Sequence, residues 1–218
     1  MDMQPEKKID GRSLRAQRTY DEVHTKLVST ATEMYNNPLI ENNKITVSSI
    51  AKNASVSVAT AYNHFPDNKL DILGSIFKLG FEEVIIEYGS FIELNHDPKD
   101  QIDEFFRLIT EKIIALGNAV RYAFFNINDI LESGKWIQGE PYDVLLSTCV
   151  KLADQNPGID PKKLAEEAFS NYNGRLFLWM RFNPNFDLWA KFTDDWFRNE
   201  SKLIFNKGHT VSEKDIPS

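Results

Sequence analysis

The sequence contains a single cysteine, Cys149, and therefore no pair of thiols for an intrachain disulfide. Such a chain must be held together by its core, and scarce cysteine is typical of proteins from reducing compartments. No run of residues approaches the roughly 18 apolar positions of a membrane-spanning helix. The first residues, MDMQPEKKIDGRS, also lack the apolar stretch of a signal peptide. These absences lead us to expect a cytoplasmic protein without membrane contact.

The signatures of phosphate-cradling loops and of serine hydrolases are missing too. The sequence holds neither G-x-x-x-x-G-K-[ST] nor G-x-S-x-G. The histidines lie too far apart in the sequence for a local metal pair: His24, His64, His96 and His209. We therefore expect no catalytic residue, no metal and no cofactor, although groups distant in the sequence can still converge in an enzyme.

Charge is distributed unevenly along the chain. The formal net charge is −7, which by itself disfavours a nucleic-acid partner. Residues 1–80, however, carry ten Lys/Arg against nine Asp/Glu, whereas residues 81–218 carry fifteen against twenty-three. The acidity therefore belongs to the C-terminal part. The basic residues within 7–26 either contact phosphate or form an ordinary solvated tail, and charge alone leaves both readings open.

Apolar residues recur at three- and four-residue steps through most of the chain, and no stretch alternates like a β-strand. Hydrophobic residues make up 42%, which is enough for a sizeable core. The pattern predicts an all-α fold with helices over 15–37, 46–54, 58–65, 68–90, 99–116, 119–131, 142–155, 161–182 and 186–206.

Residues 46–69, TVSSIAKNASVSVATAYNHFPDNK, predict two short helices joined by a tight turn. Thr46 and Ser57 are suited to capping the two N-termini, because a hydroxyl oxygen can accept from a free backbone N–H there. The small side chain of Ala51 lets the second helix cross close by, and Pro66 ends that helix. A helix-turn-helix of this kind can present its second helix to the major groove of DNA.

The second helix of this pair carries short polar side chains that can face outward from an apolar back. The amide of Asn63 can make paired hydrogen bonds to adenine in the major groove, although a plain surface role is its alternative. Thr60, Tyr62 and Lys69 offer phosphate contacts. The DNA-contacting residues that we predict are Thr46, Ser57, Ala59, Thr60, Tyr62, Asn63 and Lys69.

The stretch 46–73, T-V-S-S-I-A-K-N-A-S-V-S-V-A-T-A-Y-N-H-F-P-D-N-K-L-D-I-L, resembles the DNA-binding segment of tetracycline-repressor-like (TetR) transcriptional regulators. The turn, the short helix, the aromatic pair and the Pro-x-x-Lys break occur at that family's offsets. Ser55 departs from the family where a turn glycine is usual, and Ala59 departs where a helix-start glycine is common. A serine in a left-handed turn is strained relative to glycine.

The resemblance implies a homodimer whose last two long helices form the subunit interface. It also implies a small-molecule effector in the C-terminal part, whose binding releases double-stranded operator DNA. On this basis we divide the chain into a flexible N-terminal arm (1–14), a DNA-binding domain (15–68), an effector-binding and dimerisation domain (69–207) and a frayed tail (208–218).

Large aromatic side chains and two arginines of the C-terminal part are candidates for the effector site, although most aromatics at helical spacing belong to a core. We select Arg121, Phe124, Phe125, Trp136, Arg175 and Trp179. Residues 175–181 are apolar nearly all round the helix, which suits a subunit interface.

We therefore predict a homodimeric transcriptional repressor that an effector releases from its operator. The alternative is a helical protein-interaction or scaffold module without DNA binding, and an enzyme is the weaker third reading.

Overall fold

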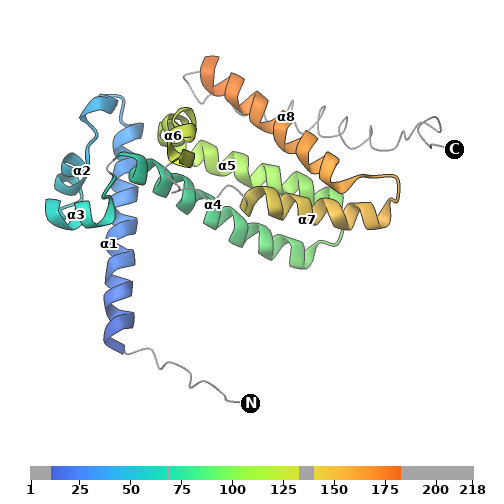
Figure 1. Cartoon of the computed structure of the whole chain (residues 1–218), viewed down its shortest axis with the longest axis horizontal. Coiled ribbons are helices and arrows are strands. Elements are labelled where there is room, and N and C mark those ends of the chain that lie inside the picture. Colours follow the sequence, from blue (N-terminus) through green and yellow to red (C-terminus); the bar gives the residue numbers. More distant parts are fainter. Residues whose placement is uncertain (1–10, 68, 133–139, 183–218) are drawn as a thin grey trace.

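The computed structural model describes residues 11–67, 69–132 and 140–182, and every regular element in these ranges is helical (Figure 1). The predicted all-α fold class is thereby confirmed. The expected helix over 186–206, the tail, Trp136 and residues 1–10 of the arm lie outside the described residues. The elements are α1 (Gly11–Asn36), η1 (Asn42–Lys44), α2 (Val47–Asn53), α3 (Val58–His64), α4 (Lys69–Leu94), α5 (Pro98–Phe125), α6 (Ile127–Glu132), α7 (Glu140–Gln155) and α8 (Pro161–Phe182).

Local side-chain chemistry sets the ends of the short helices. Thr46 caps α2 by accepting from the Ser49 N–H at 3.1 Å, while the Ser49 hydroxyl accepts from the Thr46 N–H at 2.8 Å. This reciprocal pair is a capping box. Ser57 caps α3 by accepting from the Thr60 N–H at 3.0 Å. Both predicted caps are confirmed. Helix α3 ends at His64, because a proline disfavours the helical conformation in the residue before it, here Phe65.

The turn between α2 and α3 has the strained geometry that the sequence indicated. Ser55 adopts a φ of 54°, the only positive value among the described non-glycine residues. Across the turn, the Val56 N–H donates to the Ala51 carbonyl at 2.9 Å. Ala51 and Ala61 are fully buried, so small side chains let the two helices approach. The sequence-based account of the helix pair is confirmed here.

Several helix boundaries differ from the predicted ones. Helix α7 begins at Glu140 instead of residue 142, and the gap expected between the helices over 99–116 and 119–131 lies within α5. Helix α1 begins at Gly11, so residues 11–14, which we assigned to the arm, are helical. Its first ten residues are all exposed, and in Figure 1 this end projects away from the other helices. Helix α4 continues to Leu94. The segment 119–131 is not one helix, because Asn126 interrupts it with φ −110° and ψ 17° between α5 and α6.

The two longest helices of the C-terminal part, α4 and α5, pack along each other and join the small N-terminal helices to the rest (Figure 1). Helix α4 also contacts α1, α6 and α7, which accounts for the wide distribution of buried apolar residues around it. Helix α5 is bent at Gly117, whose φ of 58° and ψ of −133° lie outside the helical region. None of the described helices is long and apolar enough to cross a membrane.

Candidate nucleic-acid interface and ligand cavity

One face of α3 is buried and the opposite face is open to solvent. Ala61, His64 and Phe65 point into the core, whereas Ala59 and Asn63 are exposed and the Tyr62 side chain is 42% exposed. Tyr62, which we predict as a phosphate contact, is thus accessible to a partner, and His64 lies on the inner face with Ala61. The exposed residues leave a small polar and aromatic surface that no described part of the chain covers.

The hydroxyl groups beside this surface are engaged in the caps. The Ser57 and Thr60 hydroxyls are 2.7 Å apart and share a hydrogen bond, and the Thr46 hydroxyl lies in its capping box. These residues hold the ends of α2 and α3 in place next to Asn63. Their remaining acceptor or donor capacity is directed at solvent, because Thr46 and Ser57 are exposed.

Basic side chains on α1 are tied to their own helix. Arg18 pairs with Glu22 at 2.8 Å, and the Arg15 guanidinium donates to the Gly11 carbonyl at 3.1 Å. Both side chains are exposed, so such pairs contribute at most about 1 kcal/mol and can exchange for another partner.

Lys69, at the start of α4, turns toward α5. Its ammonium donates to the Tyr122 hydroxyl and lies 4.2 Å from the centre of the Tyr122 ring. The same ring stacks on Tyr35 of α1, with 5.2 Å between the ring centres. Lys69, predicted as a phosphate contact, is thus half-buried between the N-terminal helices and α5. Sequence reasoning missed Tyr122 because the two residues are 53 positions apart.

A second contact joins α1 to the bend in α5. The Asn36 amide donates to the Leu116 carbonyl at 3.0 Å and accepts from the Ala119 N–H at 3.3 Å. Backbone groups at a helix break can lack their helical partners, and Asn36 bonds to two such groups on either side of Gly117. A Cβ atom on Gly117 would lie 2.7 Å from the Asn36 side-chain oxygen. Glycine is therefore needed both for the backbone conformation and for the close approach of Asn36.

Two histidines pack between α1 and α3. The His64 ring stacks on Tyr20 with centres 4.0 Å apart and lies 5.5 Å from His24, which in turn contacts Phe65. Burial lowers the pKa of both imidazoles, and for His24 the neighbouring His64 lowers it further. Both rings are therefore favoured in the neutral form, which suits a packed aromatic layer. No three His, Cys, Asp or Glu side chains gather into a metal site within the described ranges.

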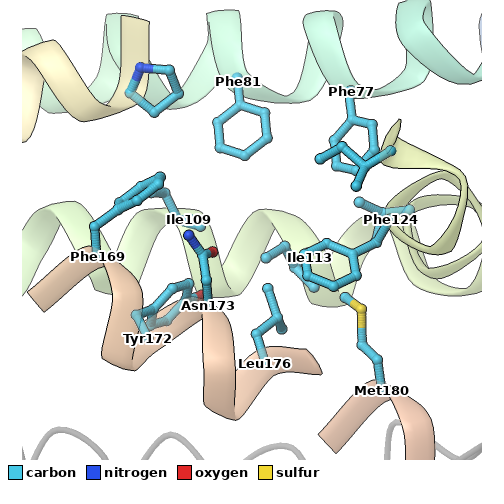
Figure 2. Close-up of a pocket in the computed structure, with 13 residues that line it drawn as sticks. Phe77, Phe81, Ile109, Ile113, Phe124, Phe169, Tyr172, Asn173, Leu176 and Met180 are labelled. Carbon is cyan, nitrogen blue, oxygen red and sulfur yellow. The ribbon is translucent and has the colours of Figure 1, made fainter. Parts of the chain in front are cut away.

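The C-terminal helices enclose a cavity of about 350 Å³ (Figure 2). Residues from α4, α5 and α8, with Ile127 and Pro141, line it, and nearly all of them are apolar. They are Phe77, Phe81, Ile109, Ile113, Val120, Phe124, Ile127, Pro141, Phe169, Tyr172, Asn173, Leu176 and Met180. This volume lies within the range of small-molecule sites.

Of the five predicted effector residues within the described ranges, only Phe124 lines this cavity. Phe125 points outward, is 41% exposed, and contacts Phe177 of α8 with ring centres 5.7 Å apart. Trp179 is buried elsewhere in the core, and Arg121 and Arg175 are half-buried away from the cavity wall. The structure therefore does not bring the predicted set together around one space.

The cavity had one signal in the sequence that we overlooked. Asn173 is a polar residue in the stripe formed by Phe169, Leu176 and Met180, which recur at three- and four-residue steps on α8. A polar residue within such a stripe points either to a buried hydrogen bond or to a cavity. The contribution of Phe77 and Phe81 had no comparable signal, because their helix is apolar on most of its surface.

The comparisons with known proteins agree with this arrangement of helices. No protein-family model matches the chain, and no curated protein matches it. Among solved structures, a chain from Syntrophomonas wolfei assigned to the TetR family of transcriptional regulators aligns with a TM-score of 0.61 at 14% identity. That alignment covers 88% of this chain and 98% of the other.

The fatty acid degradation regulator FadR from Bacillus halodurans aligns with a TM-score of 0.55 at 18% identity, over 88% of this chain and 96% of its own. At such identities the likeness concerns the fold. The chain shares the all-α fold of these two solved structures.

Proposed function

We propose that this protein is a sequence-specific DNA-binding transcriptional regulator, acting as a homodimeric repressor that a small molecule releases from its operator. The observation that carries the proposal is the capped α2–α3 pair, which buries the back of α3 and exposes Asn63 and Tyr62. Both structural neighbours are transcriptional regulators by their own descriptions. In a dimer, two such helices would enter major grooves roughly 34–36 Å apart.

Within this proposal the exposed residues of α3 take different roles. Asn63 reads a base, because its amide can both donate to and accept from adenine. The Tyr62 hydroxyl contacts a phosphate of the DNA backbone. The small side chain of the exposed Ala59 allows α3 to approach that DNA backbone closely. Thr46, Ser57 and Thr60 cap the helices and add phosphate contacts at their free lone pairs or protons.

Lys69 has two alternative partners in this scheme. Its ammonium donates to the Tyr122 hydroxyl in the present conformation and would turn to a phosphate when DNA is bound. The change exchanges an interaction with a neutral hydroxyl and a ring for an ion pair with phosphate. DNA binding would therefore release the contact between the start of α4 and Tyr122 of α5.

The cavity and the bend in α5 support the ligand response. Val120 and Phe124 line the cavity and flank Tyr122 in the sequence, and the bend at Gly117 is held by Asn36 of α1. A ligand that moves this half of α5 acts on its contact with Lys69 at Tyr122 and on its contact with Asn36 at the bend. Such coupling is reciprocal, so DNA would weaken ligand binding by the same factor.

An exposed apolar patch supports the dimer. Phe177 and Leu178 of α8 are 46% and 54% exposed, and Phe125 contacts Phe177 beside them. Apolar side chains gathered on one surface are typical of subunit interfaces. We propose that α8 forms this interface together with the expected helix over 186–206.

The test is a selection of binding sites from random duplex DNA, followed by affinity measurements on the selected sequence. We expect Asn63→Ala to lose roughly 1–3 kcal/mol and to relax discrimination at one base pair of each half-site. Gln155→Ala, which truncates an exposed amide at the end of α7, serves as the matched control and should bind as the wild type does. Failure to select any sequence would refute the proposal and favour a protein-interaction module.

A further inference from the structure

From the chemistry of the cavity wall we infer that the ligand is an uncharged, largely apolar small molecule that carries one hydroxyl or carbonyl group, which Asn173 binds. This inference rests on the proposed function in one respect, namely that the molecule bound in the cavity is the effector of the regulator. Binding to the cavity itself is a property of the protein alone and is measured without DNA.

The wall offers apolar contact on most sides. Phe77, Phe81 and Phe124 present rings from α4 and α5, and Phe169 and Leu176 face them from α8 (Figure 2). Burial of apolar ligand surface against such a wall contributes about 25 cal/mol per Å². Aromatic rings and alkyl groups are both suited to this space, since neither requires a hydrogen-bonding partner.

Two polar side chains reach the wall, and one of them is already engaged. The Tyr172 hydroxyl lies 2.8 Å from the Thr110 hydroxyl in a buried hydrogen bond. The half-buried Asn173 amide makes no hydrogen bond within the part of the chain that the structure describes. In Figure 2 it lies among the apolar side chains of the wall. An amide can donate and accept, so a ligand hydroxyl or carbonyl satisfies it.

A charged ligand is disfavoured because no charged side chain lines the cavity among the described residues. Removing an ion from water costs several kcal/mol when no opposite charge receives it. The faces of aromatic rings attract a cation by less than this cost and repel an anion, which can meet only the weakly positive ring edges. Every 1.4 kcal/mol is a factor of ten in affinity, so a neutral ligand is preferred by at least tenfold over its charged analogues.

One cation lies near enough to challenge this conclusion. Lys112 lines a small hollow of about 10 Å³ that shares Phe81, Ile109 and Ile113 with the cavity. Its ammonium is paired with Glu83, and burial lowers its pKa. Because the pair is already neutral overall, Lys112 does not attract an anionic ligand unless Glu83 is displaced. The competing possibility is therefore a carboxylate that takes the place of Glu83.

The experiment titrates the full chain with octan-1-ol, octanoate and octylammonium, which share one alkyl chain and differ in charge. Calorimetry and the shift in melting temperature report binding without DNA. We expect octan-1-ol to bind saturably and both ions to bind at least tenfold more weakly. Equal or tighter binding of either ion, or no binding of octan-1-ol, overturns the inference. Loss of octanoate binding in Lys112→Met would identify the ion's partner.

Two variants test the assigned polar contact. Asn173→Leu keeps the size of the side chain and removes its hydrogen bonds, so octan-1-ol should bind at least fivefold more weakly. Asn173→Ala repeats the test should the leucine fill the cavity, and Gln155→Leu at the exposed end of α7 is the control. Unchanged affinity in both Asn173 variants overturns the contact. Operator binding is measured separately, so a failed regulator and a failed ligand class are distinguished.

Discussion

Replacing Gly117 by alanine should destabilise the protein strongly, although the substitution adds only one methyl group. The Gly117 backbone has φ 58° and ψ −133°, a region in which a side chain is strained by about 1–3 kcal/mol. The new Cβ would lie 2.7 Å from the Asn36 oxygen and 3.2 Å from its Cγ atom. Asn36 must then move and release its bonds to Leu116 and Ala119. Each backbone group left unsatisfied costs about 1–3 kcal/mol when buried, and less here because the site is only partly buried.

We therefore expect Gly117→Ala to lose about 3 kcal/mol of unfolding free energy. For a chain of this size that corresponds to roughly 6–12 °C in melting temperature. Urea unfolding followed by circular dichroism measures the loss, with all variants at one protein concentration because dimerisation adds to apparent stability. Gly89→Ala is the matched control. Gly89 lies in α4 with open space around it, so alanine should stabilise that helix by about 0.5–1 kcal/mol.

A double-mutant cycle separates the two causes of the loss. Asn36→Ala alone should be destabilising. The double variant should lose less unfolding free energy than the sum of the two single losses, because the asparagine that clashes with the new methyl group is gone. Additive losses would show that the two side chains do not meet. A Gly117→Ala protein as stable as the Gly89→Ala protein would refute the account of the bend altogether.

Three other perturbations give clear outcomes. Lys69→Ala should weaken binding to all DNA sequences and reduce the salt dependence by about one phosphate contact, as measured by fluorescence anisotropy; an unchanged salt slope would mean that Lys69 stays on Tyr122. The free energy of unfolding should fall as the pH drops below about 6.5, because the lowered pKa values of His24 and His64 make the unfolded state bind more protons there. His64→Gln should flatten that decline in urea titrations at pH 5.5 and 7.5, and an equally steep decline would exclude this histidine. Burial raises the pKa of the Cys149 thiol to about 12, so iodoacetamide at pH 8 should modify it only after unfolding, and rapid modification of the native protein would contradict its burial.

The helix-turn-helix was predictable because its determinants are local. Thr46 and Ser57 cap helices whose first turns lie within three residues of them, and Ser55 takes the left-handed conformation that its place in the turn demands. The interruption near Gly117 was predictable only in part, because the gap expected between the helices over 99–116 and 119–131 is a bend within α5. The helix boundary at Asn126 escaped prediction because apolar periodicity continues across it.

The amino-acid sequence alone specifies the all-α class and the helix pair with its caps. These properties depend on hydrogen bonds and periodicities within one or two helical turns. The tertiary structure alone decided that Asn36 meets the bend in α5, that Lys69 meets Tyr122, and that Phe124 faces the cavity while Trp179 does not. Those pairings join residues tens of positions apart, and adjacent helical residues point about 100° apart around the axis. Which of them reaches a cavity depends on how neighbouring helices pack, and no local pattern contains that information.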